Sequence, residues 1–211
     1  MTLVMAAAWL TVGSATLYAQ APAAPGNFQV REEHEGLTIA ADPYVDASRS
    51  KERFGKKHPQ ASGILAVELQ FRNNNDYPIR LTVDSIRLVI EPPERRRQRL
   101  EPLTVEDVLA VMLNKGGAKP PSAPRTRLPI PIPRADRGKE WDKMDAVLRP
   151  MTLELGLLPP KATMRGFVYF DLNYNFDLVA HSHVYVPDLT QFGGKPLMFF
   201  ELDLGRAAAR P

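Results

Sequence analysis

The chain has 211 residues, 44% of them apolar, which is enough for one domain with its own hydrophobic core plus extensions. Its net charge of +3 and pI near 9.2 are too modest for a dedicated nucleic-acid-binding protein. The sequence contains no cysteine, which excludes thiolate metal sites, thiol nucleophiles and disulfides.

The N-terminal stretch predicts export. Residues 3–19 carry no charge and are rich in Ala, Leu and Val, as in the apolar region of a secretory signal peptide. We place the signal peptide at residues 1–21 and a Pro/Ala linker at 22–27, while a second small-x-small site that would leave Ala24 at the new N-terminus stays open. Because Met1-Thr2 supplies no basic residue, a true start further upstream and an uncleaved membrane anchor stay open, and so does a structural helix. The expected location is the periplasm or the extracellular space.

Residues 28–62 predict the first strands and a connection. Residues 28–46 fit one or two strands, the clearer being Leu37–Ala41, which ends at Asp42-Pro43-Tyr44 because proline lacks a ladder donor. Residues 48–62 are polar and basic, which predicts a loop or a short helical turn.

The most regular pattern lies at residues 64–91. Leu65, Val67, Leu69 and Phe71 alternate with polar or small residues, which places them on one face of a half-buried sheet. The run from Asn73 to Asp76 is typical of a turn. The alternation then resumes, but the apolar residues shift from odd to even positions. A regular, uninterrupted strand would therefore expose half of its apolar residues. We therefore predict a β-bulge at Asp84-Ser85, between the two sets of alternating residues, which are Ile79, Leu81 and Val83, then Ile86, Leu88 and Ile90.

Residues 92–150 interrupt the strand pattern. Thr104 is a good N-cap, with Asp107 three residues later, ahead of an apolar helical stripe that Gly116-Gly117 would end. Residues 115–139 are rich in Pro and Arg and predict an extended surface loop. Residues 141–148 predict a second short helix. The stripe of the first helix consists of Val105, Val108, Leu109, Met112 and Leu113.

Strands return in the last third of the chain. Residues 164–172 are apolar on both parities, which predicts a strand covered on both faces, and strands at 184–186 and 197–204 complete the sheet. The pattern as a whole predicts an all-β antiparallel sandwich, a single domain over residues 28–211 with an insertion at 92–150.

Two motifs add a resemblance. The segment NNNDYPIRL and the later LPPKATMRGFVYFDL resemble secreted bacterial proteins with an immunoglobulin-like sandwich of the telokin-like or late-embryogenesis-abundant type. In those modules a strand ends in an Asn/Asp turn, and a Pro-rich turn, a Gly and an aromatic-x-aromatic strand come late. The resemblance implies an immunoglobulin-like antiparallel sandwich, here with an inserted short helix and a Pro/Arg-rich loop. It brings no catalytic residues and implies an exported binding or envelope-associated module. The late motif is Pro159-Pro160, Gly166, Phe167 and Tyr169.

Two segments carry possible metal ligands. His181 and His183 lie on the same face of a strand, but a transition-metal site needs a third or fourth ligand. The segment from Asp171 to Asp177 has oxygen ligands at alternate positions, as in a calcium loop, but has Phe176 where the loop needs Gly and Ser182 where it needs Glu. The plainer interpretation is exposed strand-end histidines and a simple alternation, with the apolar members Leu172, Tyr174, Phe176 and Leu178 facing inward.

Charged residues supply two further candidates. Asp42 and Asp46 could form a carboxylate pair for acid-base chemistry, although turn capping is commoner for Asp. A cluster of arginines at the start of the insertion could bind a polyanion, or could simply be a solvated surface that protects a sheet edge. The cluster is Arg95, Arg96, Arg97 and Arg99.

These observations predict a non-catalytic binding or scaffolding module of the periplasm or cell envelope. The expected partner is an envelope protein or an anionic surface, with no nucleic acid, no cofactor and no stable membrane span after cleavage. An accessory protein that binds a polyanion or a metal ion is the alternative. The sequence leaves the oligomeric state open, and it contains no nucleophile motif, phosphate loop or HExxH that would indicate an enzyme.

Overall fold

The computed structural model describes residues 28, 30–93, 96–113, 138–154 and 156–208. The predicted signal peptide and linker, Arg95 and the Pro/Arg-rich segment 114–137 lie outside these ranges. None of the helices within them is long and apolar enough to cross a bilayer.

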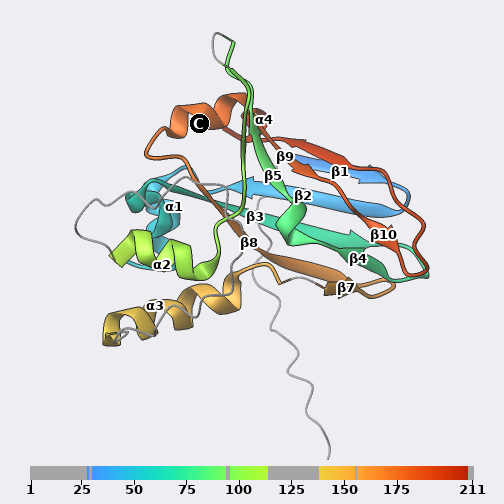
Figure 1. Ribbon diagram of the computed structural model, residues 1–211, viewed down its shortest axis with the longest axis horizontal. Helices are drawn as coiled ribbons and strands as arrows, with labels where there is room; N and C mark the ends of the chain where they lie inside the picture. Colours follow the sequence, from blue (N-terminus) through green and yellow to red (C-terminus); the bar gives the residue numbers. More distant parts are fainter. Residues whose placement is uncertain (1–27, 29, 94–95, 114–137, 155, 209–211) are drawn as a thin grey trace, which may run out of the picture.

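The first layer is an antiparallel sheet in the order β1-β2-β3-β8 (Figure 1). Its strands are β1 (Val30–His34), β2 (Leu37–Pro43), β3 (Ile64–Asn73) and β8 (Thr163–Asp171). A two-residue turn joins β1 to β2, and both of its residues, Glu35 and Gly36, have the positive φ that a type I′ hairpin turn requires. β3 pairs with β2 on one side and with β8 on the other.

The second layer consists of two short sheets that follow one another along the same chain segments. One has the order β11-β9-β5-β6 and the other β10-β4-β7. Because β4 leads into β5 and β9 leads towards β10, the two sheets are successive parts of one layer. Their strands are β4 (Ile79–Leu81), β5 (Arg87–Ile90), β6 (Gln98–Leu100), β7 (Gly156–Leu158), β9 (Ser182–Val186), β10 (Thr190–Gln191) and β11 (Phe200–Asp203).

The two layers bury their facing side chains in one core. Leu65, Val67, Leu69 and Phe71 of β3 belong to the same buried cluster as side chains from β5, β9 and β11. The paired strands of the described residues are all antiparallel, so the predicted antiparallel β architecture is confirmed. The contributors from the second layer include Leu88, Ile90, Val184, Val186, Phe200 and Leu202.

Between β4 and β5 the set of alternate residues that faces the core changes where the sequence predicts it, but a different local structure produces the change. A 3₁₀ turn, η2 (Val83–Ser85), separates the two strands in place of the predicted bulge. The turn lets Ile79 and Leu81 before it and Ile86 after it face the same core. The predicted β-bulge at Asp84-Ser85 was therefore wrong in kind, because a short helical turn corrects the parity equally well and also bends the layer.

Helices form a third layer on the other face of the first sheet. α1 (Ala47–Phe54), α2 (Val105–Leu113) and α3 (Lys139–Leu148) gather at one end of the strands, and β4, β7 and β10 lie at the opposite end (Figure 1). The shorter helices are η1 (Pro59–Ser62), η3 (Arg149–Met151), η4 (Phe176–His181) and α4 (Gly205–Ala208).

The helical layer corrects three expectations. β3 is not half-buried: Ile64 and Ala66, on its second face, pack against α1, α2 and α3. Residues 48–62, expected to be a loop or a short helical turn, contain most of the two-turn helix α1 and the 3₁₀ turn η1. The segment 92–150 contains a strand, β6, which pairs with β5, besides the two predicted helices. The architecture is therefore an antiparallel β-core with a more extensive helical cover than the sequence predicts.

Candidate functional site

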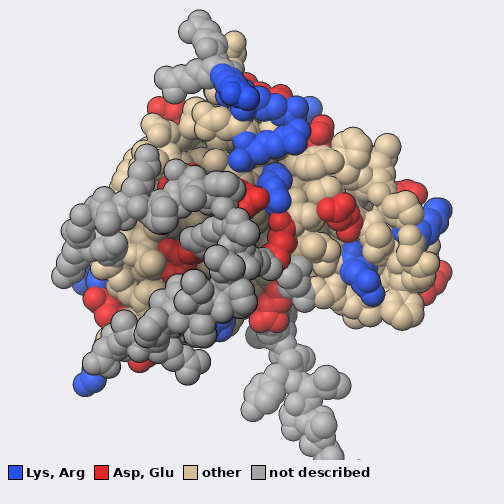
Figure 2. Space-filling view, viewed as in Figure 1, with Lys and Arg blue, Asp and Glu red and all other residues tan. Residues whose placement is uncertain are grey.

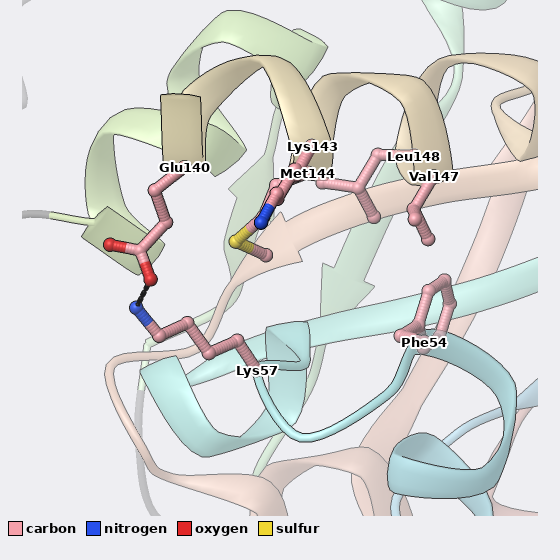
Figure 3. A pocket seen from close by; sticks show the side chains of 7 residues that line it. All are labelled: Phe54, Lys57, Glu140, Lys143, Met144, Val147 and Leu148. Carbon is pink, nitrogen blue, oxygen red and sulfur yellow. Dashed lines mark hydrogen bonds and ion pairs between the residues drawn. The ribbon is translucent and has the colours of Figure 1, made fainter. Parts of the chain in front are cut away.

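A pocket of about 310 Å³ lies between α1 and α3, at the lower end of the volumes usual for small-molecule sites (Figure 3). α3 contributes Met144, Val147 and Leu148, which lie three and four residues apart and therefore share one face of the helix. Phe54, the last residue of α1, supplies the facing wall. The walls of the pocket are therefore mainly apolar.

An aromatic cluster fixes the ring of Phe54. It meets Phe167 edge to face with ring centroids 5.0 Å apart, and Tyr44 lies edge-on to both rings, at 6.0 Å and 5.1 Å. Tyr169 stacks beside Phe167 at 6.3 Å. Such packing leaves Phe54 little freedom to turn away, so this wall of the pocket is rigid.

Charged side chains line the rim of the pocket. Lys57 and Glu140 form an ion pair that connects the segment after α1 to the start of α3 (Figure 3). Lys143, one turn further along α3, has no ion-pair partner within the described residues. Among the described residues, the pocket thus combines apolar walls with a cation, Lys143, that no neighbouring carboxylate neutralises.

Behind the aromatic cluster, two carboxylates face each other across β2 and β3. Asp42 and Glu68 are directly opposite in the sheet register, and both are buried. Arg49 of α1 binds Asp42 through both terminal nitrogens, at 2.6 and 3.2 Å. Arg165 of β8 donates to Glu68 at 2.5 Å, and Arg53 of α1 lies 4.0 Å from the same carboxylate. The pairs of Arg49 and Arg53 attach α1 to the sheet, whereas that of Arg165 links β8 to β3.

The electrostatics of this network indicate a structural role. Burial raises the pKa of Asp42, against the hydrogen bond and the charge of Arg49, which lower it. The hydrogen bond to Asp42 raises the pKa of Arg49, and that to Glu68 raises the pKa of Arg165. Asp42 and Glu68 do not line the pocket. Asp46, the other member of the predicted carboxylate pair, instead caps α1 by accepting the N–H of Arg49 at 2.8 Å.

One polar atom of the aromatic cluster has no hydrogen-bond partner within the described ranges. The hydroxyl of Tyr169 is buried and makes no hydrogen bond of good geometry within the described residues. Burial raises the pKa of this phenol, and the nearby Thr152 hydroxyl only partly offsets the rise. At ordinary pH the group is therefore a neutral phenol within the apolar cluster.

The structure does not bring the predicted metal ligands together. His181 ends η4 and is exposed, whereas His183 lies in β9 opposite Val89 and Asp203. Asp203 is already paired with Arg206. Within the described ranges, no group of three or more His, Asp or Glu side chains could hold a metal ion, so the pair has no further ligand there. The Nε2 atom of His183 is buried and has no hydrogen-bond partner among these residues.

The segment 171–177 folds as a polar turn. Asp171 accepts the N–H of Asn173 at 2.8 Å, and Asn173 and Tyr174 both have positive φ. The amide of Asn175 donates to the carbonyl groups of Leu172 and Asn173. Asp177 is exposed at the start of η4. The predicted inward alternation holds for Leu172, Phe176 and Leu178 but was wrong for Tyr174, which is exposed.

The predicted polyanion-binding arginines lie along one edge of the second layer, apart from Arg95, which is outside the described residues. Arg99 belongs to β6, and Arg96 and Arg97 precede this strand. Arg97 pairs with Glu91 at 2.8 Å, and Arg87 of β5 pairs with Glu101. Figure 2 shows basic side chains gathered over the upper part of this face, near β5 and β6, with acidic ones beside them. Glu91 and Glu101 therefore offset part of the positive charge.

Sequence reasoning missed the pocket and the charged network. The signals available were indirect: Ile64 and Ala66 are apolar on the supposedly exposed face of β3, and Asp46 and Gly55 stand at the two ends of α1 as typical helix caps. The spacing of Met144, Val147 and Leu148 showed which face of α3 is apolar, but not which residues it faces.

No family model and no curated protein matches the chain. A solved structure described as a functionally unknown protein from Listeria monocytogenes EGD-e is similar to it, with 14% identity and a TM-score of 0.34 over 75% of this chain and 70% of that chain. At that TM-score the likeness supports no argument about fold or function.

Proposed function

We propose that the protein is an exported, non-catalytic binding module of the immunoglobulin-like sandwich type, and that the pocket between α1 and α3 is its ligand site. The observation that carries the proposal is the combination of apolar walls with the cation of Lys143 at the rim, which has no ion-pair partner among the residues that the structure describes. This combination suits a small amphiphile, a molecule with a short apolar body and an anionic end. Its body would be buried against Met144 and Val147, and its charge would lie near Lys143.

Two features support binding in preference to catalysis. The carboxylate at the rim, Glu140, is paired with Lys57, and the two buried carboxylates behind the pocket are paired with arginines. A general acid or base needs a carboxylate within hydrogen-bond reach of a bound substrate. A rigid apolar wall that ends at a cation supplies affinity and orientation instead.

The proposal is tested by titrating the protein with sodium decanoate and with neutral decyl glucoside in a calorimeter, below their critical micelle concentrations. We expect Val147→Gln to weaken the binding of both probes, because it places an amide on the apolar wall. Lys143→Gln should weaken decanoate binding about fivefold and leave decyl glucoside unaffected, as expected for the loss of one exposed charge interaction.

Met198→Gln is the matched control, since Met198 is also an exposed apolar residue, at 55% against 42% for Val147, but lies beside the β1–β2 turn, where its N–H donates to Glu35. This variant should bind both probes like the wild type. Absence of binding by the wild type, or equal losses in Val147→Gln and Met198→Gln, would contradict the pocket as the ligand site.

A further inference from the structure

A second hollow lies on the outer face of the β10-β4-β7 sheet, at the end of the strands remote from α1 and α3 (Figure 1). It is a groove of about 390 Å³ lined by Arg80, Leu81, Thr82, Gly156, Leu157 and Phe192. Two of these residues are unusually exposed for large apolar residues, with 44% of Leu157 and 67% of Phe192 accessible to solvent. An apolar groove beside a sheet edge is a typical site for an extended peptide.

The hydrogen-bond pattern shows which backbone groups β7 leaves free. Phe192 N–H donates to the carbonyl of Pro78 at 3.0 Å, so the next hydrogen-bonded pair of this antiparallel ladder is Thr190 with Arg80. The main chain of Arg80 therefore points towards β10, and its pair with Leu157 of β7 is a non-hydrogen-bonded one. It follows that the N–H and C=O of Leu157 point away from β4, to the open side of β7. Within the described residues, β7 pairs with no other strand.

The groove also contains an unneutralised charge. Arg80 is exposed and forms no ion pair within the part of the chain that the structure describes. It lies directly opposite Leu157 in the sheet register, on the same outer face. Side chains of a non-hydrogen-bonded pair lie closest to one another. As far as the described residues show, one spot on this edge therefore offers a free donor, a free acceptor, an apolar side chain and a cation.

We propose that an extended, acidic segment of a partner protein adds to β7 as a fourth strand of this sheet. Its main chain bonds the free N–H and C=O of Leu157, an aromatic or aliphatic side chain covers Leu157, and a carboxylate on the same face reaches Arg80. A second copy of the chain fits less well. Self-pairing of two three-residue strands would leave both Arg80 side chains without a counter-charge and would bury little area compared with a stable interface.

The probe is the blocked heptapeptide Thr-Phe-Thr-Glu-Thr-Phe-Thr, which carries its Phe and Glu side chains on one face when extended. Binding is followed by amide chemical shifts and by hydrogen exchange at Leu157. Arg80→Glu should weaken binding about fivefold or more, and a peptide with Lys in place of Glu should restore it. Arg72→Glu is the matched control, because Arg72 is also an exposed strand arginine without an ion pair in the described residues.

Leu157→Pro tests the main-chain contact, since it removes an N–H that β4 does not use and should abolish peptide binding. If Leu157→Pro fails to fold, the comparison of Arg80→Glu with the Glu peptide and the Lys peptide still tests the proposal. The proposal is supported if the peptide slows hydrogen exchange of the Leu157 amide and if the Lys peptide restores binding to Arg80→Glu. Absence of binding by the wild type, equal effects of Arg80→Glu and Arg72→Glu, or a Leu157-dependent dimer of the free protein would overturn it.

Discussion

The two faces of β3 are built differently. The face towards the sandwich core is apolar along its whole length, from Leu65 to Phe71. The face towards the helices starts apolar at Ile64 and Ala66, and then carries the buried carboxylate of Glu68. The first face is stabilised by the burial of apolar side chains, which has no preferred direction and requires close packing. The second face is held by a few ion pairs, which require a defined geometry.

This difference explains where a pocket can exist. Close packing between two sheets leaves no room for a ligand, because each side chain on one face fits between those of the other. The helices touch the sheet through an aromatic cluster and through Arg49 and Arg53 of α1, and α1 and α3 remain far enough apart to leave a hollow. The sandwich is therefore the scaffold, and the helical layer carries the proposed ligand site.

The largest expected effect separates the two faces directly. Phe71→Ala should lower the free energy of unfolding by about 3–5 kcal/mol, because it leaves a closed cavity in the sandwich core. Phe54→Ala should cost only about 2 kcal/mol, the value of its lost burial, because its ring already borders an open pocket. Urea denaturation monitored by circular dichroism gives both values. Equal losses would show that the helical layer is packed as closely as the core.

A slightly smaller effect is expected in the ion-pair network. Arg165→Met removes the nearest cation from Glu68, whose side chain is only 1% exposed, and should cost about 3 kcal/mol. The double variant with Glu68→Gln should recover most of that loss, since no buried charge is then left unpaired. Arg149→Met is the control: it breaks the more exposed pairs with Glu106 and Asp145 and should cost under about 1 kcal/mol. If Arg165→Met and Arg149→Met lower the free energy of unfolding equally, burial does not determine how much an ion pair of this network contributes to stability.

Much of the β framework could be predicted because its signal is local. The alternation in β3, the Asn turn and the two-sided apolar pattern of β8 each lie within a few residues of sequence. The Asn turn forms as expected, with Asn75 N–H bonded to the Asn73 side chain at 2.9 Å. Which strands pair is a non-local property: β3 and β4 flank this turn but belong to different layers.

The elements missed by prediction depend on contacts between distant residues. α1 contains one large apolar residue, Phe54, so no apolar stripe indicates a helix. Its Arg49 and Arg53 find their carboxylate partners only once β2 and β3 are paired. The pocket likewise needs Phe54 to lie opposite Met144, which is ninety residues later in the chain. The spacing of apolar residues along the sequence cannot predict a contact between such distant positions.

The smallest predicted effect is a pH dependence that arises in the helical layer. His58 is buried at the N-cap of η1, where its Nδ1 accepts the N–H of Ala61 at 3.3 Å. Burial, and then the charge of Lys51, lowers the pKa of His58 below its usual 6.5. The unfolded chain therefore takes up a proton here at a higher pH than the folded chain does. The stabilising contribution is complete above pH 6.5 and is lost as the pH falls through the folded pKa.

His58→Asn isolates this contribution, because Asn keeps a cap acceptor but does not titrate. Between pH 7.5 and 5.5 the wild type should lose about 1 kcal/mol of stability relative to His58→Asn, within the limit of about 1.4 kcal/mol per pH unit for one proton. His34→Asn, at a partly exposed histidine of β1, is the matched substitution that leaves the cap at His58 in place. Taking differences between variants removes the opposite trend from Asp42, whose raised pKa favours the folded state at acid pH. Parallel curves for the wild type and His58→Asn would show that protonation of His58 does not weaken the junction between η1 and the sheet.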